Sequence, residues 1–197
     1  MRLGLFGGRF DPVHVGHLMV AQSALEALSL SELWFIPAKT PPHKEAAAAP
    51  ERRFEMLLLA TNAHPQFRVS RLEIERTGAS YTFDTVRDVR AQRPEDELFF
   101  ITGVDAYREI ASWHRARELV SSVSVVALSR PGSTLGGVEP FFKERVRLLD
   151  TPRWEVSSTE IRRRLANSES VRYLIPESVE SYLAKNPLYH EQPLHQN

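Results

Sequence analysis

The sequence predicts an α/β protein built around a parallel sheet. Short apolar runs rich in Val, Ile, Leu and Phe alternate along the chain with segments of helical periodicity, a pattern typical of strand–helix–strand units. The 197 residues, 42% of them hydrophobic, are enough to bury a sizeable core. Because the chain shows no internal repeat, low-complexity tract or long linker, we expect a single domain over residues 1–197.

The order of the expected elements follows from the apolar pattern. The first strand is expected at residues 3–6, and apolar residues that recur every three or four positions from Leu18 to Leu28 predict a helix over residues 15–28. Later apolar runs predict buried strands at residues 33–36, 67–74, 98–102, 123–128 and 146–149. Helical patterns predict helices at residues 50–62, 82–92, 115–121, 158–166 and about 177–185. The last two make up a C-terminal helical part at about residues 156–190.

Composition excludes several classes of function. The 25 Lys and Arg residues balance 25 Asp and Glu residues, so no broad field attracts nucleic acid or an anionic membrane. The absence of cysteine excludes disulfides, thiolate metal sites and cysteine nucleophiles, and is compatible with a reducing cytoplasm. No apolar run approaches the ~18–20 residues of a membrane span, and Arg9 and Asp11 interrupt the N-terminal run before it resembles a signal sequence. We therefore expect a cytoplasmic protein.

Glycine is concentrated near the N-terminus, where four of the nine glycines lie within the first 16 residues. The segment 7–17 connects the first strand to the first helix and contains Gly7, Gly8 and Gly16. Glycines there can adopt positive φ and let the backbone approach a ligand, while the helix start presents unpaired N–H groups. The segment therefore predicts a phosphate-binding turn. It is neither a dinucleotide fingerprint nor a P-loop, because both glycine patterns are absent.

His14 and His17 stand three residues apart at the start of that helix, so their side chains are expected to share one face. Three interpretations are open from the residues alone. The pair can serve a nucleotide site, lie on the surface of an ordinary turn, or supply two ligands of a metal site. The metal site would need further ligands, and nothing nearby in the sequence supplies them.

A second helix start lies near the C-terminus. Ser157 and Glu160 have the spacing of a capping box, which by itself indicates only a well-started helix. Ser158 and Thr159 in the first turn, with Arg162 one turn later, would also make a second phosphate-binding helix end.

Three loops carry further polar groups. His43 and Lys44 follow two prolines after the second strand, at the carboxyl edge of the sheet, and by themselves they indicate only a solvated loop. The stretch 80–85 opens a helix, with Asp84 as an ordinary N-terminal carboxylate. Gly103 and Asp105 end a strand, where open α/β sheets bind ligands, although a helix cap is the plainer explanation.

The motifs together resemble a known family. The segment 7–18, Gly-Gly-Arg-Phe-Asp-Pro-Val-His-Val-Gly-His-Leu, resembles the signature of the nucleotidyltransferase superfamily with the His-x-Gly-His motif, specifically the bacterial nicotinate-nucleotide adenylyltransferases. Residues 156–162, Val-Ser-Ser-Thr-Glu-Ile-Arg, are similar to the family's Ile-Ser-Ser-Thr-x-Ile-Arg motif. Pro-Pro-His-Lys at 41–44, Ser-Tyr-Thr-x-Asp-Thr at 80–85 and the spaced Gly103, Asp105 and Trp113 also match. The resemblance extends from residue 3 to residue 179.

The resemblance implies a Rossmann-like, doubly wound parallel sheet and transfer of AMP from ATP to nicotinate mononucleotide, with Mg²⁺ on the phosphates. The groups implied to contact or neutralise phosphate during transfer are His14, His17, Lys44 and Arg162. Those implied to bind ATP are Gly7, Gly8, Arg9, Phe10, Gly103, Asp105, Ser158 and Thr159. Those implied to bind nicotinate mononucleotide are His43, Tyr81, Thr85 and Trp113. The chain departs from the family at Arg9, where Ser or Thr is usual.

Rival functions differ in acceptor or in chemistry. Phosphopantetheine adenylyltransferases and some cytidylyltransferases share the first motif, but those chains are usually shorter and lack the Ser-Tyr-Thr-x-Asp-Thr stretch. Nicotinamide mononucleotide is another acceptor that the sequence leaves open. A non-catalytic nucleotide sensor would bind ATP without releasing pyrophosphate. The sequence predicts no nucleic acid or membrane partner and leaves a homodimer open.

Overall fold

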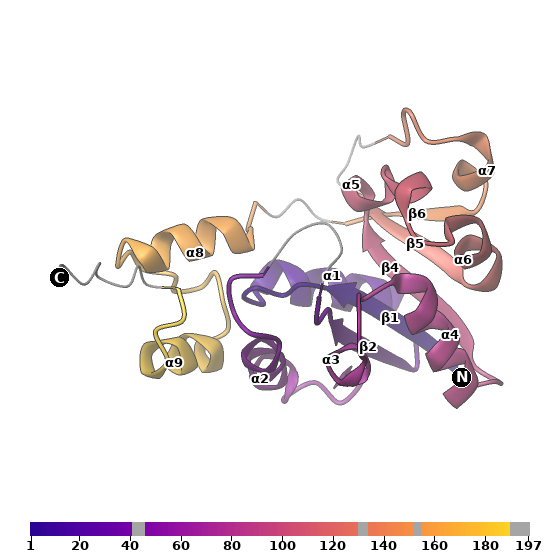
Figure 1. The fold of residues 1–197 in the computed structure, drawn as a ribbon. Helices are drawn as coiled ribbons and strands as arrows, with labels where there is room; N and C mark the ends of the chain where they lie inside the picture. Colours follow the sequence, from indigo (N-terminus) through magenta and orange to yellow (C-terminus); the bar gives the residue numbers. More distant parts are fainter. Residues whose placement is uncertain (41–45, 130–133, 152–154, 190–197) are drawn as a thin grey trace.

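The computed structural model describes residues 1–40, 46–129, 134–151 and 155–189. In this part of the chain, six strands form one sheet in the order β3-β2-β1-β4-β5-β6, and every pairing between neighbours is parallel. The strands are β1 (Arg2–Gly8), β2 (Glu32–Pro37), β3 (Phe67–Val69), β4 (Glu97–Gly103), β5 (Ser124–Ser129) and β6 (Val146–Asp150). This arrangement confirms the predicted α/β fold with a doubly wound parallel sheet (Figure 1).

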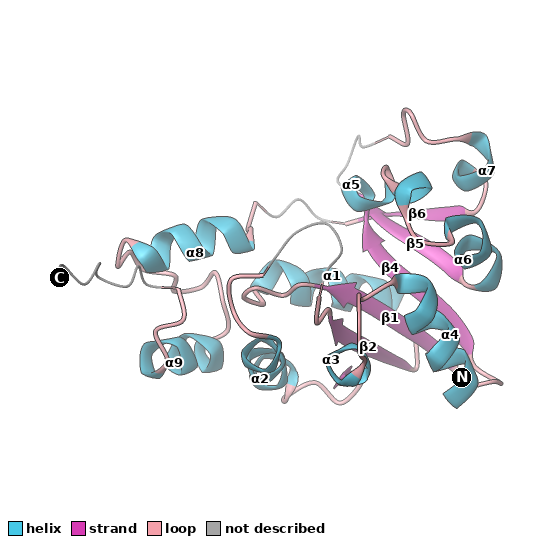
Figure 2. Cartoon of the chain, viewed as in Figure 1, coloured by secondary structure: helices cyan, strands magenta, loops and turns pink. Residues whose placement is uncertain are grey.

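Helices cover both faces of the sheet (Figure 2). The helices of the described residues are α1 (Val15–Ala27), α2 (Pro50–Thr61), α3 (Leu72–Glu75), α4 (Thr82–Gln92), α5 (Val104–Tyr107), α6 (Ala116–Ser122), α7 (Pro140–Lys143), α8 (Ser158–Ala166) and α9 (Glu177–Lys185), with a 3₁₀ turn, η1 (Ile110–Ser112). Among them, no helix has the length and apolar character needed to cross a bilayer.

Two hydrophobic cores lie on opposite faces of the sheet because side chains alternate along each strand. On β1, Leu3 and Leu5 enter the core that includes residues of α4, α5 and α6, whereas Phe6 enters the core that includes residues of α1 and α2. The C-terminal helices join the second of these cores through Ile161 of α8 and Val179 of α9. The C-terminal helices α8 and α9 therefore pack in the same core as α1 and α2.

The sheet order fixes where a ligand site can form. β1 lies in the middle of the sheet, with β2 on one side and β4 on the other. The chain builds the sheet outward from β1 through β2 to β3 and then crosses to β4 on the other side of β1, and this reversal opens a crevice beyond the carboxyl ends of β1 and β4. The turn after β1, the start of α1 and the β4–α5 junction all meet at this edge.

The predicted strand over residues 67–74 is wrong in its second half. β3 ends at Val69, and α3 follows after two residues. The Ser70 hydroxyl accepts the N–H of Leu72, and Arg71 pairs with Glu75 one turn later. These local bonds favour a helical turn, while Ile74 is still buried in it. The apolar pattern therefore indicated burial correctly and the backbone conformation incorrectly.

Candidate active site

The turn between β1 and α1 is tightly packed. Its glycines do not use the positive φ open to them, since the positive-φ glycines of the described residues are Gly78 and Gly137. The left-handed residue of the turn is Phe10, with φ of 50°. Glycine is needed at position 8 for space, because a Cβ there would lie 2.9 Å from the Phe10 ring. Phe10 itself is buried against Phe6, so only its backbone is left to contact ATP.

His14 and His17 form a stacked pair at the start of α1, with ring centroids 3.6 Å apart. The backbone N–H of His14 donates to Nδ1 of His17 at 3.2 Å. Because Nδ1 accepts, the proton of a neutral His17 ring sits on Nε2. Burial lowers the pKa of His14 to about 4, and burial together with the neighbouring His14 holds the pKa of His17 well below its usual value. Both imidazoles are therefore neutral at physiological pH.

The second motif lies directly against this turn. Ser157 caps α8 by accepting the Glu160 N–H at 3.2 Å. The hydroxyl of Ser158 donates to the backbone oxygen of Pro12 at 2.9 Å, and Nη1 of Arg162 donates to the backbone oxygen of Asp11 at 2.7 Å. Two segments nearly 150 residues apart in the sequence thus meet at one place, which is what a shared phosphate site requires.

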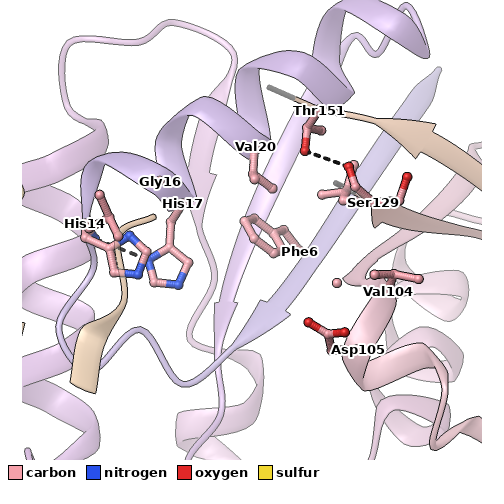
Figure 3. Close-up of a pocket in the computed structure, with 12 residues that line it drawn as sticks. Phe6, His14, Gly16, His17, Val20, Val104, Asp105, Ser129 and Thr151 are labelled. Carbon is pink, nitrogen blue, oxygen red and sulfur yellow. Dashed lines mark hydrogen bonds between the residues drawn. The ribbon is translucent and has the colours of Figure 1, made fainter. Parts of the chain in front are cut away.

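A cavity of about 310 Å³ opens beside the histidine pair. Figure 3 shows His14 and His17 on one side, Val104 and Asp105 on another, and Phe6 between them. The full lining is Phe6, His14, Gly16, His17, Val20, Gly103, Val104, Asp105, Leu128, Ser129, Thr151 and Val156. Of the residues predicted to bind ATP, Gly103 and Asp105 line this cavity, whereas the segment 7–10, Ser158 and Thr159 do not.

A second cavity, of about 620 Å³, lies between the start of α4, α5 and the segment 112–114. Its lining includes Tyr81 and Trp113, both predicted to bind nicotinate mononucleotide, and Ala106 of α5. The Tyr81 ring stacks on His114 with centroids 4.4 Å apart. The two cavities adjoin the same short helix, because Asp105 lines the first and Ala106 lines the second. The residues predicted from the sequence thus include lining residues of both cavities.

Other predicted site residues have different surroundings. The Thr85 side chain is buried, where its hydroxyl donates to Glu73 at 2.6 Å and accepts from Arg76 at 2.9 Å. This hydroxyl links α3 to α4, so a contact of Thr85 with substrate is left to its backbone. His43 and Lys44 lie outside the described residues.

Sequence reasoning missed several residues that shape the site. Arg53 of α2 is fully buried and donates to the backbone oxygens of Arg9, Ala38 and Ala48. It therefore ties the β1–α1 loop to both ends of the β2–α2 loop, while burial lowers the pKa of its guanidinium. No pattern distinguished this arginine from an exposed one. Ser129, at the end of β5, could have been found from its place at the carboxyl end of a strand.

Comparison with known proteins identifies the family. The cytidylyltransferase-like family model matches residues 5–164. The chain is 49% identical over 193 residues to a probable nicotinate-nucleotide adenylyltransferase of Thermus thermophilus, covering 96% of this chain and 100% of that one. It is 43% identical over 190 residues to the protein of the same description from Geobacillus kaustophilus, covering 95% and 86%. The chain belongs to the nicotinate-nucleotide adenylyltransferases of the cytidylyltransferase-like family. This membership confirms the resemblance seen in the motifs.

A solved structure supports the fold of this family member. The Plasmodium falciparum nicotinic acid mononucleotide adenylyltransferase complexed with NaAD superposes with a TM-score of 0.77, covering 95% of this chain and 97% of that one. The two sequences are 19% identical, so the likeness concerns the arrangement of the backbone.

Proposed function

We propose that this protein transfers AMP from ATP to nicotinate mononucleotide, giving nicotinate adenine dinucleotide and pyrophosphate. The observation that carries the proposal is the contact between the turn that leads into α1 and the start of α8, made by Ser158 on Pro12 and by Arg162 on Asp11. Two helix N-termini with a guanidinium beside them favour the binding of a polyphosphate. Membership of the family names the acceptor.

In this reaction an oxygen of the 5′-phosphate attacks the α-phosphorus of ATP in line. The bond to the bridging oxygen of the β-phosphate breaks, and pyrophosphate leaves with the negative charge. No protein side chain becomes covalently attached. Catalysis rests on holding two anionic reactants together and stabilising charge as it moves to the leaving oxygen.

The proposed roles follow from the state of each group. His17, with its proton on Nε2, and His14 act on the triphosphate as hydrogen-bond donors that enter the reaction uncharged. Arg162 supplies positive charge to the β and γ phosphates, and Lys44 is assigned a similar part on the family resemblance. Gly103 and Asp105 hold the ATP ribose, and Tyr81 and Trp113 enclose the pyridine ring.

Mg²⁺ is proposed to enter with ATP. The described residues contain no group of three or more His, Cys, Asp or Glu side chains placed to hold a metal ion. The donor set therefore fits an ion carried by phosphate oxygens rather than one held in a protein cage. Bound there, Mg²⁺ neutralises charge on the triphosphate.

The proposal is tested by supplying the purified protein with ATP, Mg²⁺ and one acceptor at a time. The acceptors are nicotinate mononucleotide, nicotinamide mononucleotide and phosphopantetheine, and both pyrophosphate release and the dinucleotide are measured. We expect product with nicotinate mononucleotide at the highest kcat/KM. A preference for the amide would change the acceptor but keep the chemistry, and ATP binding without pyrophosphate release from any acceptor would favour the sensor.

A further inference from the structure

A buried carboxylate lies at the centre of the contact between the two motifs. Asp11 is 2% exposed, and the proposed transfer gives it no chemical role. Its Oδ1 accepts the Tyr189 hydroxyl at 2.8 Å and the Ala48 N–H at 3.1 Å, and its Oδ2 accepts the Ala47 N–H at 2.6 Å. A carboxylate removed from water needs such donors. All three of these donors are electrically neutral.

Arg162 adjoins this carboxylate without forming a close ion pair. Its Nη1 donates to the backbone oxygen of Asp11 at 2.7 Å but lies 3.8 Å from the Oδ2 atom. A close charged pair has N–O distances of about 2.7–2.9 Å. The guanidinium is thus fixed in place by a neutral carbonyl. The side chain of Arg162 keeps a quarter of its surface exposed, which leaves positive charge available to an incoming anion.

Tyr189 reaches Asp11 from the other end of the chain. It follows α9 by four residues, and its side chain is buried in the same core as α1 and α2. Burial and the adjacent Asp11 raise the pKa of its hydroxyl far above the usual value. The hydroxyl therefore keeps its proton at all physiological pH values and serves Asp11 as a permanent donor.

We propose that Tyr189 is a positioning residue for ATP binding, whose hydroxyl saturates Asp11 and thereby keeps the Arg162 guanidinium directed at the triphosphate. If Tyr189 stops donating, Oδ1 loses a hydrogen bond and the carboxylate becomes a stronger acceptor for the nearest cation. The Arg162 guanidinium then forms a close ion pair with Asp11, and its positive charge is neutralised within the protein instead of binding the phosphates of ATP. The inference rests on the proposed function, because it assumes that Arg162 binds phosphate.

The first test is Tyr189→Phe, which removes one oxygen and keeps the buried ring. Binding of ATP with Mg²⁺ is measured by calorimetry without acceptor, so that no turnover occurs. We expect the Kd for ATP to rise about tenfold, while the KM for nicotinate mononucleotide stays within about twofold of wild type. The matched control is Tyr182→Phe, because the Tyr182 hydroxyl also donates to a carboxylate, that of Glu55, on helices that line neither cavity. Tyr182→Phe should leave the Kd for ATP unchanged.

A double-mutant cycle separates positioning from general loosening of the fold. If Tyr189 acts through Arg162, the Tyr189→Phe change has no further effect on ATP binding once Arg162→Ala is present. Equal Kd values for Arg162→Ala and the double variant support the inference. The inference is overturned if the two substitutions raise the Kd for ATP by independent factors that multiply in the double variant. It is also overturned if either Tyr189→Phe or Arg162→Ala alone leaves the Kd unchanged.

The outcomes also distinguish this inference from the proposed function. Wild-type protein that makes no dinucleotide from any acceptor refutes the function. Wild-type protein that turns over normally, with Tyr189→Phe equal to it in ATP affinity, refutes only the role of Tyr189. Thermal melting of each variant monitors folding. If Tyr189→Phe does not fold, Ala47→Pro takes its place, because proline at position 47 deletes the N–H that donates to Oδ2 of Asp11. That variant is expected to weaken ATP binding in the same direction, and unchanged affinity in it overturns the inference.

Discussion

The buried neutral state of His14 has a measurable effect on stability as pH falls. In the unfolded chain a histidine binds its proton near pH 6.5, whereas folded His14 resists protonation until about pH 4. Between these values the unfolded state binds more protons, so the free energy of unfolding decreases as pH falls. Each pH unit in this window costs about 1.4 kcal/mol per such group. The whole window therefore removes about 3 kcal/mol, of which about 2.5 kcal/mol is lost by pH 4.5.

The assay compares the wild type with His14→Gln, because other groups also titrate over this range. Urea unfolding is followed by tryptophan fluorescence at pH 7.5, 6.5, 5.5 and 4.5. The difference in stability between the two proteins should shift by about 2.5 kcal/mol toward the variant from pH 7.5 to 4.5. His64→Gln controls for loss of an imidazole elsewhere, since His64 bonds to Gln22 and stacks on Phe67 outside the cavity of the histidine pair. Parallel curves for wild type and His14→Gln would refute the reasoning, because His14 would then protonate freely in the folded protein.

Three further substitutions examine other parts of the site. His17→Ala should lower turnover about 10²–10³-fold, or ~3–4 kcal/mol, with the fold retained, and near-normal turnover would show that its role is misassigned. Gly8→Ala places a Cβ 2.9 Å from the Phe10 ring, so urea unfolding should reveal a loss of about 1–3 kcal/mol; undiminished stability would mean that the ring moves aside. Arg53→Met deprives three backbone oxygens of a buried donor and should lower Tm by about 6–12 °C, which corresponds to about 3 kcal/mol, whereas a change under ~2 °C would contradict this.

The elements that the sequence predicted best are those with local signals. The helices α4, α8 and α9 have the predicted bounds, because apolar periodicity, and in α8 also the Ser157 cap, acts within a few positions. The short helices α5 and α7 have four residues each, too few for a period to be visible. The end of β3 was misplaced for a similar reason, since the bonds that mark the change of backbone conformation, from Leu72 to Ser70 and from Arg71 to Glu75, span only a few residues.

The site was predictable only in part, because some of its contacts join residues far apart in the chain. The motifs around His14 and Arg162 were visible in the sequence, and the structure brings them together. The donors to Asp11 were not visible, because Tyr189 lies 178 residues away in a segment with no motif of its own. Arg53 was missed because an arginine in an amphipathic helix has the same sequence pattern whether it faces water or three carbonyl groups.

The electrostatics of the site address a problem that every transfer between two anions presents. Groups that bind ATP and the transition state equally tightly do not accelerate the chemical step, since only additional stabilisation of the transition state does. Burial keeps His14 and His17 neutral, so in the proposed mechanism their attraction for the resting substrate is limited to hydrogen bonds. Negative charge that builds up beside them raises their pKa values and strengthens those bonds at the moment of transfer. In the proposed mechanism fixed positive charge comes from Arg162 and Lys44, and we infer that Asp11 and Tyr189 hold Arg162 in place without neutralising it.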